Sequence, residues 1–149
     1  MDFGVATVTR GECAAREGYI AVAEAAERLG FGFISVNDHV VVPRDIASRY
    51  PYSESGEWAA RTVGECLDQL TTLGFLAART ERLQLLTSVM VVPQRHAVLT
   101  AKMLATIDVL SKGRLIVGCG VGWLKEEFEA LGAPPFPSAG VRRTNTSMP

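Results

Sequence analysis

The sequence predicts an α/β fold in which short apolar strands alternate with amphipathic helices. One observation is that the apolar runs are short and are bounded by glycine, proline, asparagine or aspartate, as buried strands are. Another is that the segments between them are rich in alanine and leucine, with apolar residues at helical spacing. Strands and helices that alternate with right-handed crossovers form a parallel sheet. Four such units predict half of an eight-fold barrel, with a small open sheet as the alternative.

The expected elements follow one another in a regular order. We expect strands at Phe3–Val8, Gly32–Val36, Leu83–Met90 and Leu115–Val117, and helices at about Glu12–Leu29, Asp68–Arg79, Ala97–Leu110 and Leu124–Leu131. Gly30 suits the left-handed position that ends a helix, and Asp68 suits an N-cap. The continuous apolar run Leu115–Val117 predicts a parallel strand covered on both faces. Glu126 and Glu127, at the start of the last helix, suit the helix dipole.

Composition places the chain among ordinary soluble globular proteins. Its 149 residues suffice for one domain, and 48% of them are hydrophobic and 21% charged. A net charge of −1 gives no electrostatic reason to expect nucleic acid or an anionic membrane as a partner. The N-terminus does not resemble a signal peptide, and the most apolar window, Leu83–Pro93, is too short to span a bilayer. We therefore expect a soluble, cytoplasmic protein.

The cysteines do not form a metal-binding pattern. Cys13, Cys66 and Cys119 are odd in number and lie far apart in the sequence. Such spacing matches no zinc motif and no disulfide framework of a small secreted domain. We expect reduced thiols and no metal site.

Asp38 and His39 directly follow the second expected strand. In a parallel α/β fold, ligands bind at the carboxyl ends of the strands. A histidine there can act as a general acid or base near neutral pH, and the adjacent Asp38 can orient the ring or accept a hydrogen bond from a ligand. The alternative is a plain turn, in which Asp38 bonds its own backbone and His39 is merely exposed. His96, next to a helix start, is expected to be structural.

Two further stretches could contact a ligand. Gly118, Gly120 and Gly122 remove side chains after the fourth strand, so a flat ring or a phosphate could approach the backbone closely. The alternative is a tight turn without a ligand, because the spacing does not match the dinucleotide-binding fingerprint. The irregular segment Val40–Gly64 carries three large aromatic residues, Tyr50, Tyr52 and Trp58. A loop of this length predicts an active-site lid, with a disordered insertion as the alternative.

Several stretches together resemble the luciferase-like monooxygenase family, and more narrowly its branch that uses the deazaflavin coenzyme F420. The stretches are Ala23–Pro43, Ser48–Trp58, Leu67–His96 and Leu104–Gly132. The resemblance implies a (β/α)8 barrel of the TIM type, of which residues 1–136 would supply the first four βα units as an N-terminal half-barrel. Residues 137–149 show no apolar periodicity and are expected to form a disordered tail outside the family pattern.

The resemblance also assigns roles to residues on the second and third strands. His39 would be the catalytic proton donor or acceptor, and Asp38 would contact the cofactor. Ser88 and Val89 match the place where family members carry a non-proline cis peptide bond behind the cofactor ring. From composition alone this stretch is an ordinary strand.

The same resemblance implies that Gly118, Gly120 and Gly122 form a glycine turn beside the ring. The implied reaction is hydride transfer between coenzyme F420 and a small organic substrate. One alternative is a monooxygenase that uses flavin mononucleotide (FMN) and molecular oxygen. Another is a non-catalytic fragment that acts only by association.

The chain departs from the family pattern in two places. Deazaflavin-dependent sugar-phosphate dehydrogenases carry a catalytic Glu where this chain has Trp123, which argues against a sugar-phosphate substrate. The aromatic residues of the expected lid favour an apolar or aromatic one. The family also runs well beyond this length, so we expect a truncated or frameshifted product. Its unpaired sheet edges predict a marginally stable chain that forms a homodimer or aggregates.

Overall fold

The computed structural model describes residues 3–11, 14–59 and 66–134. Four parallel strands form one sheet in the order β1-β2-β3-β4: β1 (Gly4–Thr7), β2 (Phe33–Val36), β3 (Gln84–Val91) and β4 (Leu115–Gly120). The helices are α1 (Arg16–Leu29), α2 (Gln69–Arg79), α3 (Ala97–Leu110) and α4 (Lys125–Ala130), with a short 3₁₀ helix, η2, at Val92–Gln94. The predicted alternation is confirmed. Cys13, the expected start of the first helix and the tail at 137–149 lie outside the described residues.

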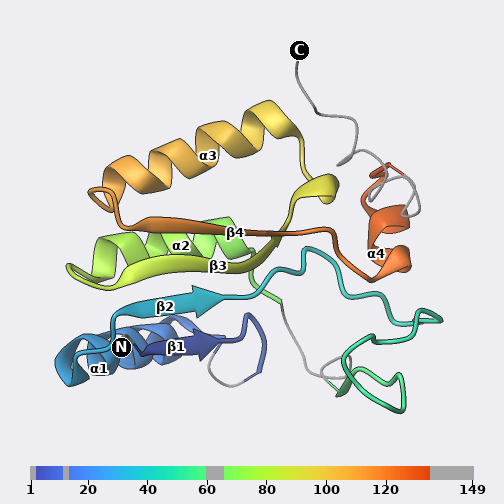
Figure 1. The fold of residues 1–149 in the computed structure, drawn as a ribbon, viewed down its shortest axis with the longest axis horizontal. Helices are drawn as coiled ribbons and strands as arrows, with labels where there is room; N and C mark the ends of the chain where they lie inside the picture. The colour runs from blue at the N-terminus through green and yellow to red at the C-terminus, as the bar shows by residue number, and fades with distance from the viewer. Residues whose placement is uncertain (1–2, 12–13, 60–65, 135–149) are drawn as a thin grey trace.

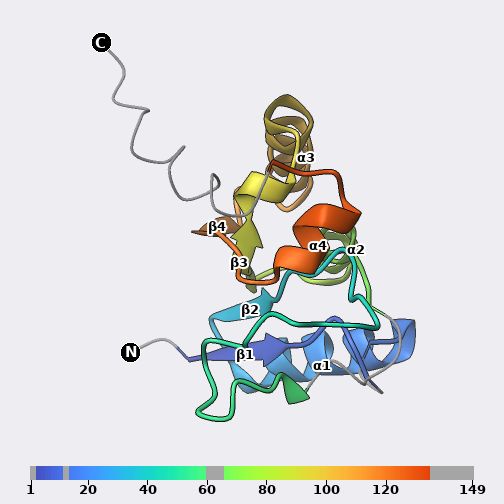
Figure 2. The same ribbon diagram turned by 90° about the vertical axis from the view of Figure 1, so that its right-hand side faces the viewer.

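The arrangement is that of part of a barrel wall. Neighbours in the sheet are neighbours in the sequence, and every pair is parallel, as in successive βα units of a barrel. Figure 2 shows α1 and α2 on the same side of the sheet. Figure 1 shows α4 and the segment after β2 together at the end where the strands finish. The segments that follow β2 and β4 thus lie together at the carboxyl ends of the strands.

Local signals in the sequence set the helix ends. Gly30 has a φ of 79° and ends α1, and Asp68 caps α2 by accepting a hydrogen bond from the backbone N–H of Thr71 at 2.8 Å. His96 caps α3, because its Nδ1 accepts a hydrogen bond from the N–H of Leu99 at 3.4 Å. The expectation that His96 is structural is therefore confirmed.

The core lies between the sheet and its helices. Helix α2 supplies three leucines with no more than 1% exposure, and these face apolar side chains from the two central strands. The residues are Leu70, Leu73, Leu76, Ile34, Val36 and Leu85. Burial of such side chains is the main favourable term that holds strands and helices together. Among the described residues, no helix combines the length and apolar character needed to cross a membrane.

The prediction that Leu115–Val117 is covered on both faces is wrong. Ile116 is 40% exposed and Val117 39% exposed, and the strand continues through the glycines to Gly120. Within the described chain, β4 pairs only with β3, so it forms an edge of the sheet. The length of β4 is set by its backbone pairing with β3, which continues to Gly120. The hydrophobicity of the side chains does not predict that length.

Candidate functional site

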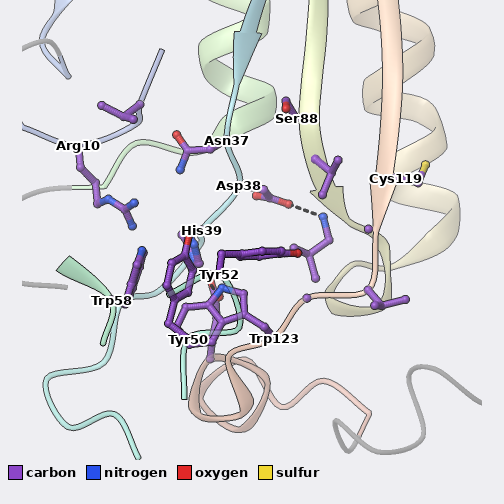
Figure 3. A pocket seen from close by; sticks show the side chains of 17 residues that line it. Arg10, Asn37, Asp38, His39, Tyr50, Tyr52, Trp58, Ser88, Cys119 and Trp123 are labelled. Atoms are coloured by element: carbon purple, nitrogen blue, oxygen red, sulfur yellow. Dashed lines mark hydrogen bonds and ion pairs between the residues drawn. The ribbon is translucent and has the colours of Figure 1, made fainter. Parts of the chain in front are cut away.

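A cavity of about 670 Å³ lies at the carboxyl ends of the strands. Its walls come from residues that follow β1 and β2, from the bend in β3 and from the segment that joins β4 to α4 (Figure 3). The three aromatic residues of the expected lid, Tyr50, Tyr52 and Trp58, all line it. The described part of that loop is therefore a wall of the cavity, whereas residues 60–64 of the expected lid lie outside the described residues.

His39 is held in this cavity by a buried carboxylate. Its Nδ1 lies 3.0 Å from Oε2 of Glu127, which α4 supplies and which is 1% exposed. The other oxygen of Glu127 accepts hydrogen bonds from the backbone N–H groups of Val40 (2.7 Å) and Val41 (3.1 Å). Burial of Glu127 opposes its ionisation, but the hydrogen bond and charge of His39 and the two amides outweigh this and lower the pKa of the carboxyl.

An ionised Glu127 can only accept hydrogen bonds, so Nδ1 of His39 must carry the proton that they share. No described residue bonds the other ring nitrogen, Nε2, and the imidazole lines the cavity. This arrangement fixes both the tautomer and the direction of the ring, as a carboxylate does for a general-base histidine. The plain turn with an exposed His39 is thus not what the structure contains.

Glu127 is a site residue that the sequence pattern does not predict. In the sequence, Glu126 and Glu127 indicate only a favourable interaction with the helix dipole. Glu127 is 88 positions from His39 in the sequence, and no local pattern joins the two. The available signal was two acidic residues soon after a glycine-rich strand end.

Asp38 ties the end of β2 to the end of β3. Its Oδ2 accepts a hydrogen bond from the N–H of Val91 at 2.8 Å, and its Oδ1 accepts one from Nη2 of Arg95 at 2.6 Å. Asp38 is 3% exposed, and this pairing explains how a carboxylate tolerates that burial. Asp38 lines the cavity but does not bond His39, so neither the turn nor the ring-orienting alternative describes it. Its contact with a cofactor stays a prediction.

The wall formed by β3 carries the irregularity that the resemblance implied. The peptide bond between Ser88 and Val89 is cis, and the register between β3 and β4 shifts between Thr87 and Met90. Both Ser88 and Val89 line the cavity, and Val89 is 46% exposed there. The cis bond expected here is present, whereas contact of these residues with a cofactor stays a prediction.

The three candidate glycines have different surroundings. A Cβ on Gly118 would clash with the carbonyl oxygen of Thr87, and one on Gly120 would lie 2.5 Å from the Val89 side chain. These two glycines therefore let β4 fit against the irregular part of β3. Gly122 has a φ of 79°, which a glycine adopts readily. Gly120 and Gly122 line the cavity, but Gly118 is not among its lining residues.

Aromatic rings cover His39 from the side of the lid. The ring centroids of His39 and Trp58 are 4.6 Å apart, and those of Trp58 and Trp123 are 5.3 Å apart in an edge-to-face arrangement. Tyr50 packs edge-to-face on Trp123 at 5.0 Å. Such pairs are typical aromatic contacts. Trp123 therefore lies inside the site, with its ring centroid 6.4 Å from that of His39.

The thiol of Cys66 supports the backbone at the same place. Its Sγ donates a hydrogen bond to the carbonyl oxygen of His39 at 3.0 Å, and Thr9 lies 3.5 Å from it. Burial raises the pKa of this thiol. A protonated thiol is the state that can donate this bond. Cys66 and Cys119 are both free cysteines, as the sequence predicts.

Comparison with known proteins identifies the chain at the family level. The family model for luciferase-like monooxygenases matches residues 1–145. The chain belongs to the luciferase-like monooxygenase family. It is 34% identical over 124 residues to an uncharacterised protein of Mycobacterium tuberculosis, covering 83% of this chain and 43% of that relative. It is also 40% identical over 67 residues to an FMNH2-dependent dimethylsulfone monooxygenase of Pseudomonas putida, covering 45% of this chain and 18% of the relative.

Solved structures share the fold of this chain. A monooxygenase from Streptomyces bottropensis matches with a TM-score of 0.69 and 28% identity, covering 95% of this chain and 39% of that one. A coenzyme F420-dependent tetrahydromethanopterin reductase from Methanopyrus kandleri matches with a TM-score of 0.60 and 22% identity, covering 89% and 30% of the two chains. The chain therefore spans less than half the length of these relatives. The α/β class and the partial TIM-type barrel are confirmed.

Proposed function

We propose that these residues form the cofactor and proton-transfer part of an oxidoreductase that moves hydride between coenzyme F420 and a small organic substrate. The observation that carries the proposal is the His39–Glu127 pair inside the cavity. Glu127 holds the proton on Nδ1, which leaves Nε2 to give or take the proton that accompanies hydride movement at a carbon–oxygen bond. Aromatic side chains around the imidazole exclude water from that proton transfer.

The cavity has features that suit a flat ring. Val89 presents an exposed apolar side chain on one wall, and Gly120 and Gly122 leave backbone without a Cβ beside it. Ser88, Val89, Gly120 and Gly122 would hold the ring, in agreement with the family resemblance. The bound deazaflavin would supply a two-electron hydride carrier, and the chain would position it and keep water away.

A second candidate is a monooxygenase that uses reduced FMN and molecular oxygen. It is favoured by the 40% identity to the FMNH2-dependent dimethylsulfone monooxygenase, although the matched stretch is only 67 residues long. The monooxygenase from Streptomyces bottropensis, at 28% identity, supports a monooxygenase reaction without indicating the cofactor. The same cavity would serve either cofactor, so affinity is the property that separates the two candidates.

Cofactor binding is the direct test. The chain has two tryptophans, Trp58 and Trp123, and both line the cavity, so quenching of their emission reports a bound ligand. We expect F420 to quench at lower concentration than FMN. Tighter binding of FMN would refute the first candidate in favour of the second. If neither cofactor quenched, both would be refuted, and a fragment that acts only by association would be favoured.

The role of His39 needs a matched histidine as a control. We expect His39→Asn to bind the preferred cofactor as the unmodified protein does, but to lower turnover about 10²–10⁴-fold, the usual contribution of a general acid or base. Turnover is followed as oxidation of reduced F420 by a panel of small aldehydes, ketones and enones. His96→Asn replaces the other histidine, which caps α3 away from the cavity, and should leave turnover unchanged. Equal turnover of the two variants would remove the proton-transfer role.

A further inference from the structure

Arg10 is a buried cation in the wall of the cavity. It follows β1, is 7% exposed and lines the cavity together with His39 and Asn37. Its guanidinium carbon lies 4.3 Å from the centroid of the Trp58 ring, the same ring that contacts His39. In Figure 3 the guanidinium points from the β1 side toward His39 and Trp58. Its charge therefore reaches the region where a substrate would meet the imidazole.

No described residue satisfies the hydrogen-bonding capacity of this guanidinium. Among the described residues, the buried ones that carry a charged side chain are Arg10, Asp38 and Glu127. Asp38 pairs with Arg95, and Glu127 pairs with His39. Arg10 has no hydrogen bond or ion pair to any of the described residues, and its Nη1 is buried without a partner. Buried charges are ordinarily paired, and the described residues supply no partner for this one.

The electrostatics agree with a missing anion. Burial lowers the pKa of Arg10, and the more distant Cys66, Glu127 and Tyr50 only partly offset this. None of these three groups bonds the guanidinium. Asn37 adds a neutral donor at the same wall: its Oδ1 accepts the backbone N–H of Thr9 at 2.8 Å, which leaves its Nδ2 free to donate.

We propose that Arg10, with Asn37 beside it, binds the carboxylate of an apolar or aromatic acid that is the substrate of this site. The inference rests on the proposed function, because it takes His39 as the group that faces the reacting part of the substrate. A guanidinium offers paired N–H donors in a plane, which match the two oxygens of a carboxylate. The guanidinium carbon lies over the Trp58 ring, and the aromatic residues of the lid provide an apolar surface for the rest of the acid.

A phosphate of the cofactor is the other oxyanion that Arg10 could hold. The position of Arg10 favours the substrate. Figure 3 shows Arg10 on the side of the pocket near His39 and Trp58, opposite Ser88 and Cys119, whereas the expected ring-binding residues Ser88 and Val89 lie on the β3 wall. The experiment below separates the two sources.

The test compares benzoate with its uncharged analogue benzamide, with Trp58 and Trp123 emission as the readout. We expect the protein to bind benzoate at least about tenfold more tightly than benzamide, the effect of one charge-assisted pair. Arg10→Met should reduce this preference to about twofold or less. Arg10→Lys should keep part of it, since lysine retains the charge but not the paired donors. Arg79→Met, at an exposed arginine on α2, should bind as the unmodified protein does.

Several results would overturn the proposal. One is equal binding of benzoate and benzamide, or no quenching by either compound; another is a benzoate preference that survives in Arg10→Met. If Arg10→Met weakened binding of FMN but not of riboflavin, which lacks the phosphate, the oxyanion would belong to the cofactor. Failure of the proposed function is distinguishable, because it would appear as no quenching by F420 or FMN while the benzoate preference persisted.

The stability of the variant gives an independent readout. An unpaired buried charge opposes folding, so Arg10→Met should melt at the same temperature as the unmodified protein or higher. A large drop in melting temperature would mean that the protein itself holds the guanidinium, against the proposal. If Arg10→Met did not fold, Arg10→Lys would decide, since an unchanged benzoate preference there would exclude the paired-donor contact.

Discussion

Replacing Glu127 with glutamine isolates what the buried carboxylate contributes, because glutamine keeps the shape of the side chain and removes its charge. Glu127 accepts hydrogen bonds from His39 at 3.0 Å, Val40 at 2.7 Å and Val41 at 3.1 Å. A hydrogen bond to a charged group contributes about 1.5–3 kcal/mol, against about 0.5–1.5 kcal/mol for a neutral one. Glutamine also places an amide N–H opposite one of these donors, which leaves that donor without an acceptor.

We therefore expect Glu127→Gln to lower the free energy of unfolding by about 2–4 kcal/mol at pH 7, allowing for non-additivity. The pKa of Glu127 lies below its ordinary value of 4.5 in the folded protein. Its contribution is thus complete above the unfolded-state pKa and is lost as the pH falls through the lowered, folded-state pKa. The difference between the two proteins should shrink when the pH is taken below about 4.

Urea unfolding followed by tryptophan emission measures this difference at neutral and acidic pH. Glu129→Gln is the matched control on the same helix, because the Glu129 side chain is 63% exposed and pairs with Lys125. An exposed pair of this kind contributes about 0–1 kcal/mol. If the two variants had the same stability at pH 7, or if the Glu127→Gln difference grew toward acid, the account of the buried pair would be wrong.

Three further perturbations test other parts of the structure. Arg114→Met should lower the free energy of unfolding by about 3 kcal/mol, because the guanidinium donates five hydrogen bonds to oxygens of the last turn of α2, of the α2–β3 turn and of Ser111. An unchanged urea midpoint would contradict this. Gly118→Ala should destabilise by about 1–3 kcal/mol, since its Cβ would meet β3, whereas the control Gly74→Ala, with open space in α2, should be neutral or stabilising in the same assay. Glu126→Gln should speed amide hydrogen exchange at Ala47 and Ser48, because their N–H groups donate to the Glu126 carboxylate at 2.8 and 2.9 Å. Exchange as slow as in the unmodified protein would show that these hydrogen bonds do not hold the segment in place.

The fold could be predicted from the sequence because its signals are local. Alternating apolar runs and amphipathic segments, a left-handed glycine at Gly30 and a capping Asp68 each act within a few residues. Successive parallel strands with right-handed crossovers then leave few topologies, and the observed strand order is one of them. The placement of His39 at the carboxyl end of β2 followed from the same reasoning, since parallel sheets bring those ends to one face.

The tertiary structure alone decided which groups act together at that face. The carboxylate that holds His39 is Glu127 and not its neighbour Asp38, which is instead bound by Arg95 and by the backbone of Val91. Arg10 is left as a buried cation without a partner among the described residues. Hydrogen bonds and charge pairs depend on distances between side chains that lie tens of residues apart. Periodicity in the sequence does not encode those distances, so only the tertiary structure shows which side chains pair.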